Sequence, residues 1–178
     1  FYGANSKTMS HYGMIRESEG PEKLLDYFRQ EGVPHSLIRD NAKIQASKVW
    51  NDYLHQYWVK DKFTEPYYEQ QNPFERAFAT HKMKIERVMI DTGCDPKAWF
   101  KAACHVADIS NHTAHATLNY RTPMEARDGE TPDISALCNF KFWELVYFRK
   151  HPKYDFPGKG GNEGLGRWLG RAIDHGDK

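Results

Sequence analysis

The sequence predicts an α/β fold, because short apolar segments of strand length alternate with longer segments in which apolar residues recur every three or four positions. The chain has 178 residues, 39% of them hydrophobic and 14% aromatic, which is enough for one ordinary core with a small appended piece. No internal repeat is evident. We therefore expect a globular α/β domain followed by a smaller structure.

Residues 1–57 are expected to form two short strands, a helix, a third strand and a second helix. Residues 1–15 place apolar and aromatic residues among turn formers, which is typical of a short antiparallel pair. Pro21 suits a first helical turn, Leu24, Leu25 and Phe28 recur at helical spacing, and Gly32 suits a helix end, so a helix is predicted there. Residues 36–38 then form a brief strand that leads into Arg39 and Asp40. Helical spacing follows at Val49, Trp50, Tyr53, Leu54 and Tyr57.

The middle of the chain contains the two longest helical patterns. Before them, residues 60–68 form a charged stretch with proline, in which Phe63 is a candidate strand residue. A helix is predicted from Pro73 to just before Gly93, with an apolar or neutral stripe at Phe74, Phe78, His81, Ile85 and Val88. A further helix is predicted to begin after Asp95 and to end near Asn119, with an inward face of Trp99, Ala102, Ala103, Val106 and Ile109.

The last third of the chain predicts a boundary followed by strands. Residues 122–135 are rich in turn residues and acids, and we place a linker at 122–136 between a core at 1–121 and a piece at 137–178. In that piece, residues 140–148 and the string RWLGRAI are strand-like, and GKGGNEGLG is interpreted as the connector. We expect these strands to begin a small β-barrel.

The overall charge is uninformative, because 25 basic residues nearly balance 24 acidic ones, so a polyanionic partner is neither demanded nor excluded. The three cysteines have no C-x-x-C spacing, which favours reduced thiols in an intracellular protein.

No stretch approaches the roughly 20 apolar residues of a membrane span, so we expect no membrane partner. Three histidines share the predicted helix that ends near Asn119, but without a metal motif we interpret them as packed or solvated.

Two acids suggest chemistry on nucleic acid. Asp40 stands in IRDNAK at a strand end, and Glu75 stands in EQQNPFER at a helix start, with thirty-four residues between them. Transfer at an anionic phosphodiester needs charge stabilisation and an aligned oxygen nucleophile, which carboxylate-held Mg²⁺ ions supply. Mg²⁺ prefers a few hard oxygen ligands in a site open on one side. The pair therefore suggests metal-dependent cutting or joining of nucleic acid.

Each of the two acids also has a purely structural interpretation. Asn72 can cap the helix that follows, and Glu75 would then complete a capping box worth roughly 1 kcal/mol. Asp40 beside Asn41 can form an Asx turn as the chain leaves the strand. Neither structural role excludes catalysis, so both interpretations stay open.

The ordered strings RDNAK, QQNPFER, PKAWFKAA, RTPMEARDGETPDIS and FKFWELVYF resemble the integrase core of copia-type LTR retrotransposons, within the retroviral-integrase-like group. The resemblance covers nearly the whole chain. It implies a ribonuclease H-like fold, with a mixed sheet flanked by helices, and an Asp, Asp, Glu triad in which Asp40 and Glu75 match the second and third acids. It further implies Mg²⁺, or Mn²⁺ in its place, as the metal that Asp40 and Glu75 bind.

The resemblance also implies the reaction and the partners. Such enzymes trim DNA 3′ ends and join them to target DNA, work as oligomers on two DNA ends, and act in the nucleus. Lys82 matches a family position that contacts the DNA end, and Gln71 matches a polar loop position near the scissile site. With Asn72 and Arg76 they form the expected DNA-binding set, although a charged helix face is most often merely solvated.

The sequence departs from the family pattern at its start. No acid precedes Glu17, so the first Asp of the triad is missing, and the family's zinc-binding region is missing too. We expect the chain to be a segment of a longer protein, with weak metal affinity and little or no activity by itself. Two other interpretations remain: a non-catalytic nucleic-acid-binding or protein-interaction module from a decayed or domesticated element, and a related nuclease that cleaves without strand transfer.

Overall fold

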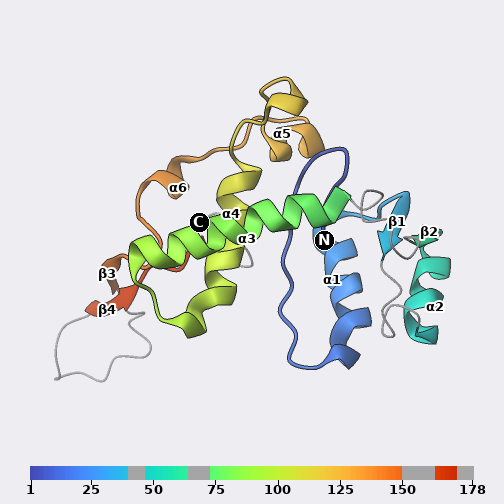
Figure 1. The fold of residues 1–178 in the computed structure, drawn as a ribbon, viewed down its shortest axis with the longest axis horizontal. Helices are drawn as coiled ribbons and strands as arrows, with labels where there is room; N and C mark the ends of the chain where they lie inside the picture. Colours follow the sequence, from blue (N-terminus) through green and yellow to red (C-terminus); the bar gives the residue numbers. More distant parts are fainter. Residues whose placement is uncertain (40–46, 64–72, 150–162, 172–178) are drawn as a thin grey trace. The chain divides into compact units, whose positions relative to one another are not determined.

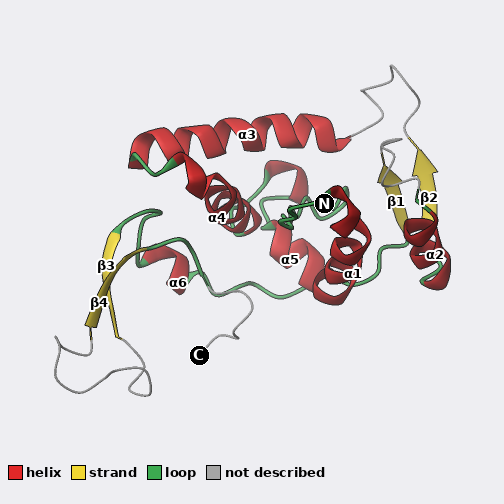
Figure 2. Cartoon of the chain, turned by 90° about the horizontal axis from the view of Figure 1, so that it is seen from below, coloured by secondary structure: helices red, strands yellow, loops and turns green. Residues whose placement is uncertain are grey.

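The computed structural model describes residues 1–39, 47–63, 73–149 and 163–171 (Figure 1). These residues divide into two compact units, Phe1–Thr80 and His81–Lys178. Helices and strands both contribute, as Figure 2 shows, and the predicted α/β class is confirmed. Within the described residues, no helix combines the length and apolarity that a membrane span requires. The predicted domain plan, with its linker at 122–136, stays a prediction.

The first unit begins with a narrow turn rather than with the two predicted strands. Only one antiparallel bridge, Tyr2 with Met9, forms there, because the chain folds back tightly and Lys7 donates its backbone N–H to Gly3 over 2.6 Å. A 3₁₀ turn then leads into helix α1, which has Pro21 in its first turn and ends before Gly32, where φ is 85°. The bounds are Glu17–Glu19 for η1 and Gly20–Glu31 for α1.

A strand, a helix and a second strand follow as a parallel β-α-β unit, with bounds Ser36–Arg39 for β1, Lys48–Gln56 for α2 and Lys60–Phe63 for β2. The Ser47 hydroxyl caps α2 by accepting the backbone N–H of Trp50 over 3.3 Å. The strands are in register from Ser36 opposite Lys60 to Arg39 opposite Phe63. Since they are parallel, both strands end at the same edge of the sheet.

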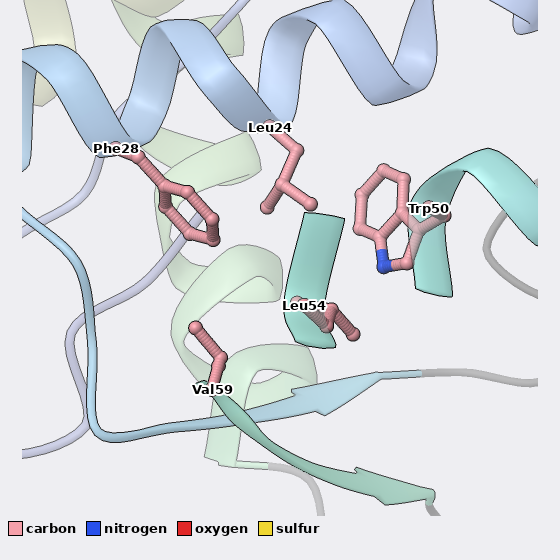
Figure 3. Packing of buried hydrophobic residues seen from close by; sticks show 5 residues of the cluster. All are labelled: Leu24, Phe28, Trp50, Leu54 and Val59. Carbon is pink, nitrogen blue, oxygen red and sulfur yellow. The ribbon is translucent and has the colours of Figure 1, made fainter. Parts of the chain in front are cut away.

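The core of the first unit joins α1 to α2. Figure 3 shows Leu24 and Phe28 of α1 facing Trp50 and Leu54 of α2, with Val59 closing the cluster just before β2. The four helical residues fall at the spacings that the sequence pattern predicts. Each fully buried side chain of this kind stabilises the fold by about 1.5–3 kcal/mol.

Helix α3 (Pro73–Thr92) spans its predicted range and is followed by η3 (Pro96–Ala98) and α4 (Trp99–Asn111). In the second unit, Cys94, Ala102 and Phe142 form a buried cluster against the inner side of α3. The predicted end of α4 near Asn119 is wrong. The string NHTAH has low helix propensity, and Asn119 adopts the left-handed conformation at φ 55°. Two predicted inward residues are also exposed, Trp99 at 60% and Ile109 at 37%.

The predicted turn-rich boundary contains a helix. After η4 (Ala116–Leu118), helix α5 covers Pro123–Asp128. Thr122 caps it, because its hydroxyl accepts the Glu125 N–H over 3.1 Å while the Glu125 carboxylate accepts the Thr122 N–H over 3.3 Å. Gly129 ends it at φ 81°. A short helix, α6 (Ser135–Cys138), follows.

The chain then forms an antiparallel hairpin of β3 (Leu145–Arg149) and β4 (Glu163–Arg167). β3 begins five residues later than the predicted run 140–148. β4 lies mostly inside the glycine-rich string that was interpreted as a connector and shares only Arg167 with the predicted strand string RWLGRAI. The reason is packing: a Cβ at Gly164 would lie 2.5 Å from the Phe148 ring, so this glycine leaves room for that ring in a regular strand. The described strands make a two-stranded sheet here, and the start of a small β-barrel stays a prediction.

Candidate functional site

The last residue of β1, Arg39, is the centre of a polar cluster at the edge where both strands end. Its side chain is buried and forms two parallel hydrogen bonds with Asp61 of β2, Nε to Oδ1 at 2.8 Å and Nη2 to Oδ2 at 2.5 Å. Nη2 also donates to Asn51 Oδ1 of α2 over 2.8 Å. The guanidinium lies 4.3 Å from the centre of the Phe63 ring. One side chain therefore ties β1 to α2 and to β2.

This cluster fixes the point from which the chain leaves the sheet. A fork-shaped pairing of Arg with a carboxylate is geometrically specific, because two parallel bonds set both distance and orientation. Asp40 follows Arg39 directly in the chain but lies outside the described residues. The sequence contained one usable signal for the cluster, the alternation in KDKF that puts Asp61 and Phe63 on one side of β2.

A pocket of about 340 Å³ opens beside the same cluster. Its polar lining is already engaged, since Arg39 donates hydrogen bonds to both Asn51 and Asp61. The remaining wall is apolar except for His55, and it consists of Leu54, Val59 and Phe63. We assign no ligand to this pocket.

Glu75 is exposed in the first turn of α3, at the third helical position. The positive end of the helix dipole lies in this first turn and favours a carboxylate there, whatever else the residue does. The predicted cap Asn72 lies outside the described residues, as does Gln71. The capping interpretation and the catalytic interpretation of Glu75 therefore both remain predictions.

Arg76 and Lys82, the two predicted DNA-binding cations in the described part, are exposed on α3. Helical periodicity places Lys82, seven residues on, on the same side of the helix as Glu75. It turns Arg76 about 100° away from Glu75, so the two cations do not share one stripe. Three of the six predicted site residues therefore lie on α3. That Asp40 lies close to Glu75 in space stays a prediction.

The described residues contain no cluster of three or more metal-ligating side chains. The histidines of the second unit have other contacts. His112 donates from Nδ1 to the backbone oxygen of Asp108 over 2.7 Å, and its Nε2 accepts from Arg171 over 3.2 Å. Arg171 also holds the buried Asp108 carboxylate, at 2.6 and 3.0 Å. His115 instead contacts Thr117 through Nδ1 over 2.8 Å.

Two other histidines of this unit have shifted proton affinities. Burial lowers the pKa of His81 below its ordinary value of 6.5, although a hydrogen bond with the backbone of Ala103 acts in the opposite direction. Burial likewise lowers the pKa of His105, and here the charge of Asp108 opposes the shift. Both side chains are therefore favoured in their neutral form.

No protein-family model matches the chain. Two curated proteins of fission yeast, Schizosaccharomyces pombe, the transposon Tf2-3 and Tf2-4 polyproteins, are each 30% identical to it over 117 residues. The aligned region is 65% of this chain but 8% of each polyprotein, so the chain spans a small part of these relatives.

Solved structures reveal the fold. The HTLV-2 integrase catalytic core domain, determined in complex with magnesium, matches with a TM-score of 0.59 at 16% identity, over 71% of this chain and 80% of that chain. A simian T-cell lymphotropic virus intasome, determined in complex with the PP2A regulatory subunit B56 gamma, matches with a TM-score of 0.57 at 19% identity, over 89% of this chain and 56% of that chain.

These similarities confirm the predicted resemblance to an integrase core and the ribonuclease H-like fold class. The narrower assignment to copia-type elements stays a prediction. The chain therefore has the fold of a retroviral integrase catalytic core, and part of its sequence is similar to transposon polyproteins.

Proposed function

We propose that the chain is the core of a retroelement integrase that, within a longer protein, trims DNA 3′ ends and joins them to target DNA. One observation carries the proposal: in a chain with the integrase-core fold, Arg39 anchors the strand end that leads directly into Asp40, and Glu75 is exposed at the start of α3. A carboxylate that must reach a phosphodiester has to be exposed, and Glu75 meets that condition.

The donor chemistry fits a divalent cation. Asp40 and Glu75 are hard oxygen donors of the kind that Mg²⁺ prefers, and Mn²⁺ accepts them as well. When bound, such ions offset the charge that develops on the reacting phosphate. Asp40 and Glu75 would hold them, with the family's first Asp supplied from the longer protein. The magnesium in a solved structural neighbour is compatible with this assignment.

The cations of α3 would bind the DNA backbone. Lys82, on the same side of the helix as Glu75, would neutralise a phosphate near the reacting end, and Arg76 would contact a neighbouring strand segment. Gln71 and Asn72 would contact the DNA end from the segment before α3. The nucleophile would be water in trimming and the DNA hydroxyl in joining, so no covalent protein intermediate is required.

The partners that we propose are DNA ends, target DNA and further copies of the protein. One solved neighbour is an intasome, which is compatible with these partners, and the reaction would take place in the nucleus. The segment alone would have little activity, because two acids carry less charge than three for holding two dications. A non-catalytic module from a decayed element is the second candidate, because DNA binding by the exposed Arg76 and Lys82 does not itself require the two acids.

The test is a DNA end-joining assay on the longer protein that contains this segment, with Asp40→Asn and Glu75→Gln. Asp52→Asn is the control, because Asp52 is an exposed acid on α2. Joined product in the unchanged protein and in the control, with none in either site variant, supports the integrase. Cleavage without joining indicates a nuclease, and DNA binding without either product indicates the non-catalytic module. Unchanged joining in both site variants would refute the assignment of the two acids.

A further inference from the structure

Helix α2 ends in a left-handed turn occupied by a tryptophan. Trp58 has φ 56°, its N–H donates to the His55 carbonyl over 3.1 Å, and the Val59 N–H donates to the Leu54 carbonyl over 2.9 Å. This pair of bonds is the Schellman motif, in which the left-handed position is usually glycine. The apolar contact that accompanies the motif is present too, since Leu54 and Val59 both belong to the core (Figure 3).

The indole of Trp58 contributes little to folding. It is 90% exposed, whereas the motif's hydrogen bonds come from backbone atoms and its apolar contact from Leu54 and Val59. A side chain at a left-handed position also carries a steric cost that glycine avoids. A large aromatic residue that is strained and exposed at once is better explained by contact with another molecule.

Two lysines continue this surface along β2. Val59, Asp61 and Phe63 face the core and Arg39, so strand alternation directs Lys60 and Lys62 to the opposite side. Both lysines are exposed, and neither forms an ion pair with a residue in the described ranges. We call Trp58, Lys60 and Lys62 the Trp58 surface.

We infer that the Trp58 surface binds single-stranded nucleic acid, with an unpaired base stacked on the indole and adjacent phosphates against Lys60 and Lys62. Every base has a face that can stack on an aromatic ring, and lysines supply the complementary charge. A protein partner fits less well, because lysine is depleted in protein–protein interfaces. This inference deepens the proposed function by adding a DNA contact outside the predicted acids. It rests on that proposal in one respect, which is that the proposal identifies the nucleic acid as DNA.

The deciding variant is Trp58→Gly, because glycine is the residue that the left-handed turn prefers. It should leave Tm unchanged or raise it by up to about 4 °C, while weakening binding of a short single-stranded DNA oligonucleotide by about 5- to 100-fold in fluorescence anisotropy.

The joint variant Lys60→Gln with Lys62→Gln should make oligonucleotide binding less sensitive to salt. The magnitude of the slope of log K for binding against log salt concentration should fall by about 1.4. The Trp99→Ala and Lys101→Gln pair, also exposed and two residues apart, is the matched control and should bind normally.

The inference is overturned if Trp58→Gly binds the single strand as tightly as the unchanged protein. It is equally overturned if the variant loses affinity for single strand and duplex by the same factor, because stacking needs an unpaired base. Asp40→Asn and Glu75→Gln should leave this binding intact. Failure of the proposed reaction and failure of the Trp58 surface are therefore observed separately.

Discussion

Arg39, the last residue of β1, and Asp61, the second residue of the parallel strand β2, are joined by two parallel hydrogen bonds of 2.8 and 2.5 Å. The Arg39 side chain is only 3% exposed and the Asp61 side chain 26%, so the pair is largely removed from water. Removing one partner of such a pair leaves a charge without compensation, which costs far more than the intact pair contributes.

Asp61→Ala should therefore lower the free energy of unfolding by about 3 kcal/mol, measured by urea denaturation. The double variant Arg39→Met with Asp61→Leu should recover most of that loss, because no unpaired charge remains. Asp91→Ala is the control, since its ion pair with Arg87 is exposed, and it should cost less than about 0.5 kcal/mol. Equal losses in Asp61→Ala and Asp91→Ala would contradict a buried, orienting role for the Arg39 pair.

Thr122→Ala should destabilise the second unit by about 1 kcal/mol, because it removes the side chain that caps α5. Thr122→Ser keeps the hydroxyl and should retain most of the stability. Thermal unfolding monitored by circular dichroism compares the two. A Thr122→Ser variant as unstable as Thr122→Ala would mean that the methyl group, and not the cap, matters.

The second unit should lose stability as pH falls below about 6.5. Burial holds the pKa values of His81 and His105 below 6.5, so the folded form keeps both rings neutral while the unfolded chain takes up protons. The unfolded state then binds more protons, and stability rises with pH through this window and levels off above it. His81→Gln should reduce the slope of Tm against pH between 5 and 7, whereas Met83→Gln, exposed on the same helix, should not. An unchanged slope in His81→Gln would exclude this histidine as a source.

Much of the helical structure could be predicted from the sequence. Leu24 and Phe28 on α1, and Trp50 and Leu54 on α2, are buried members of the predicted stripes, whereas Val49 and Tyr57 of the second stripe are exposed. Gly32 and Gly93 end α1 and α3 where predicted. These features depend on residues close together in the chain. Periodicity and end signals suffice for them.

The rest depended on contacts that local patterns do not encode. Arg39 meets Asp61 across 22 residues, and the pairing exists only in the register that sets Arg39 opposite Phe63. β4 was missed because Gly164 and Gly166, which look like loop residues, make space for the ring of Phe148. The helix α5 could have been found, since T-P-M-E is a capping-box pattern, but the surrounding turn residues outweighed it.

The most direct test of the central claim compares Glu75→Gln with Glu22→Gln in the DNA end-joining assay. Glu22 is the matched control, because it too is an exposed acid at the third position of a helix with proline in its first turn. If Glu75 is a metal ligand, Glu75→Gln should lose about 100-fold or more of the joining rate, while Glu22→Gln joins normally. Equal rates in the two variants would show that Glu75 only caps its helix, and would contradict the assignment of this residue to the active site.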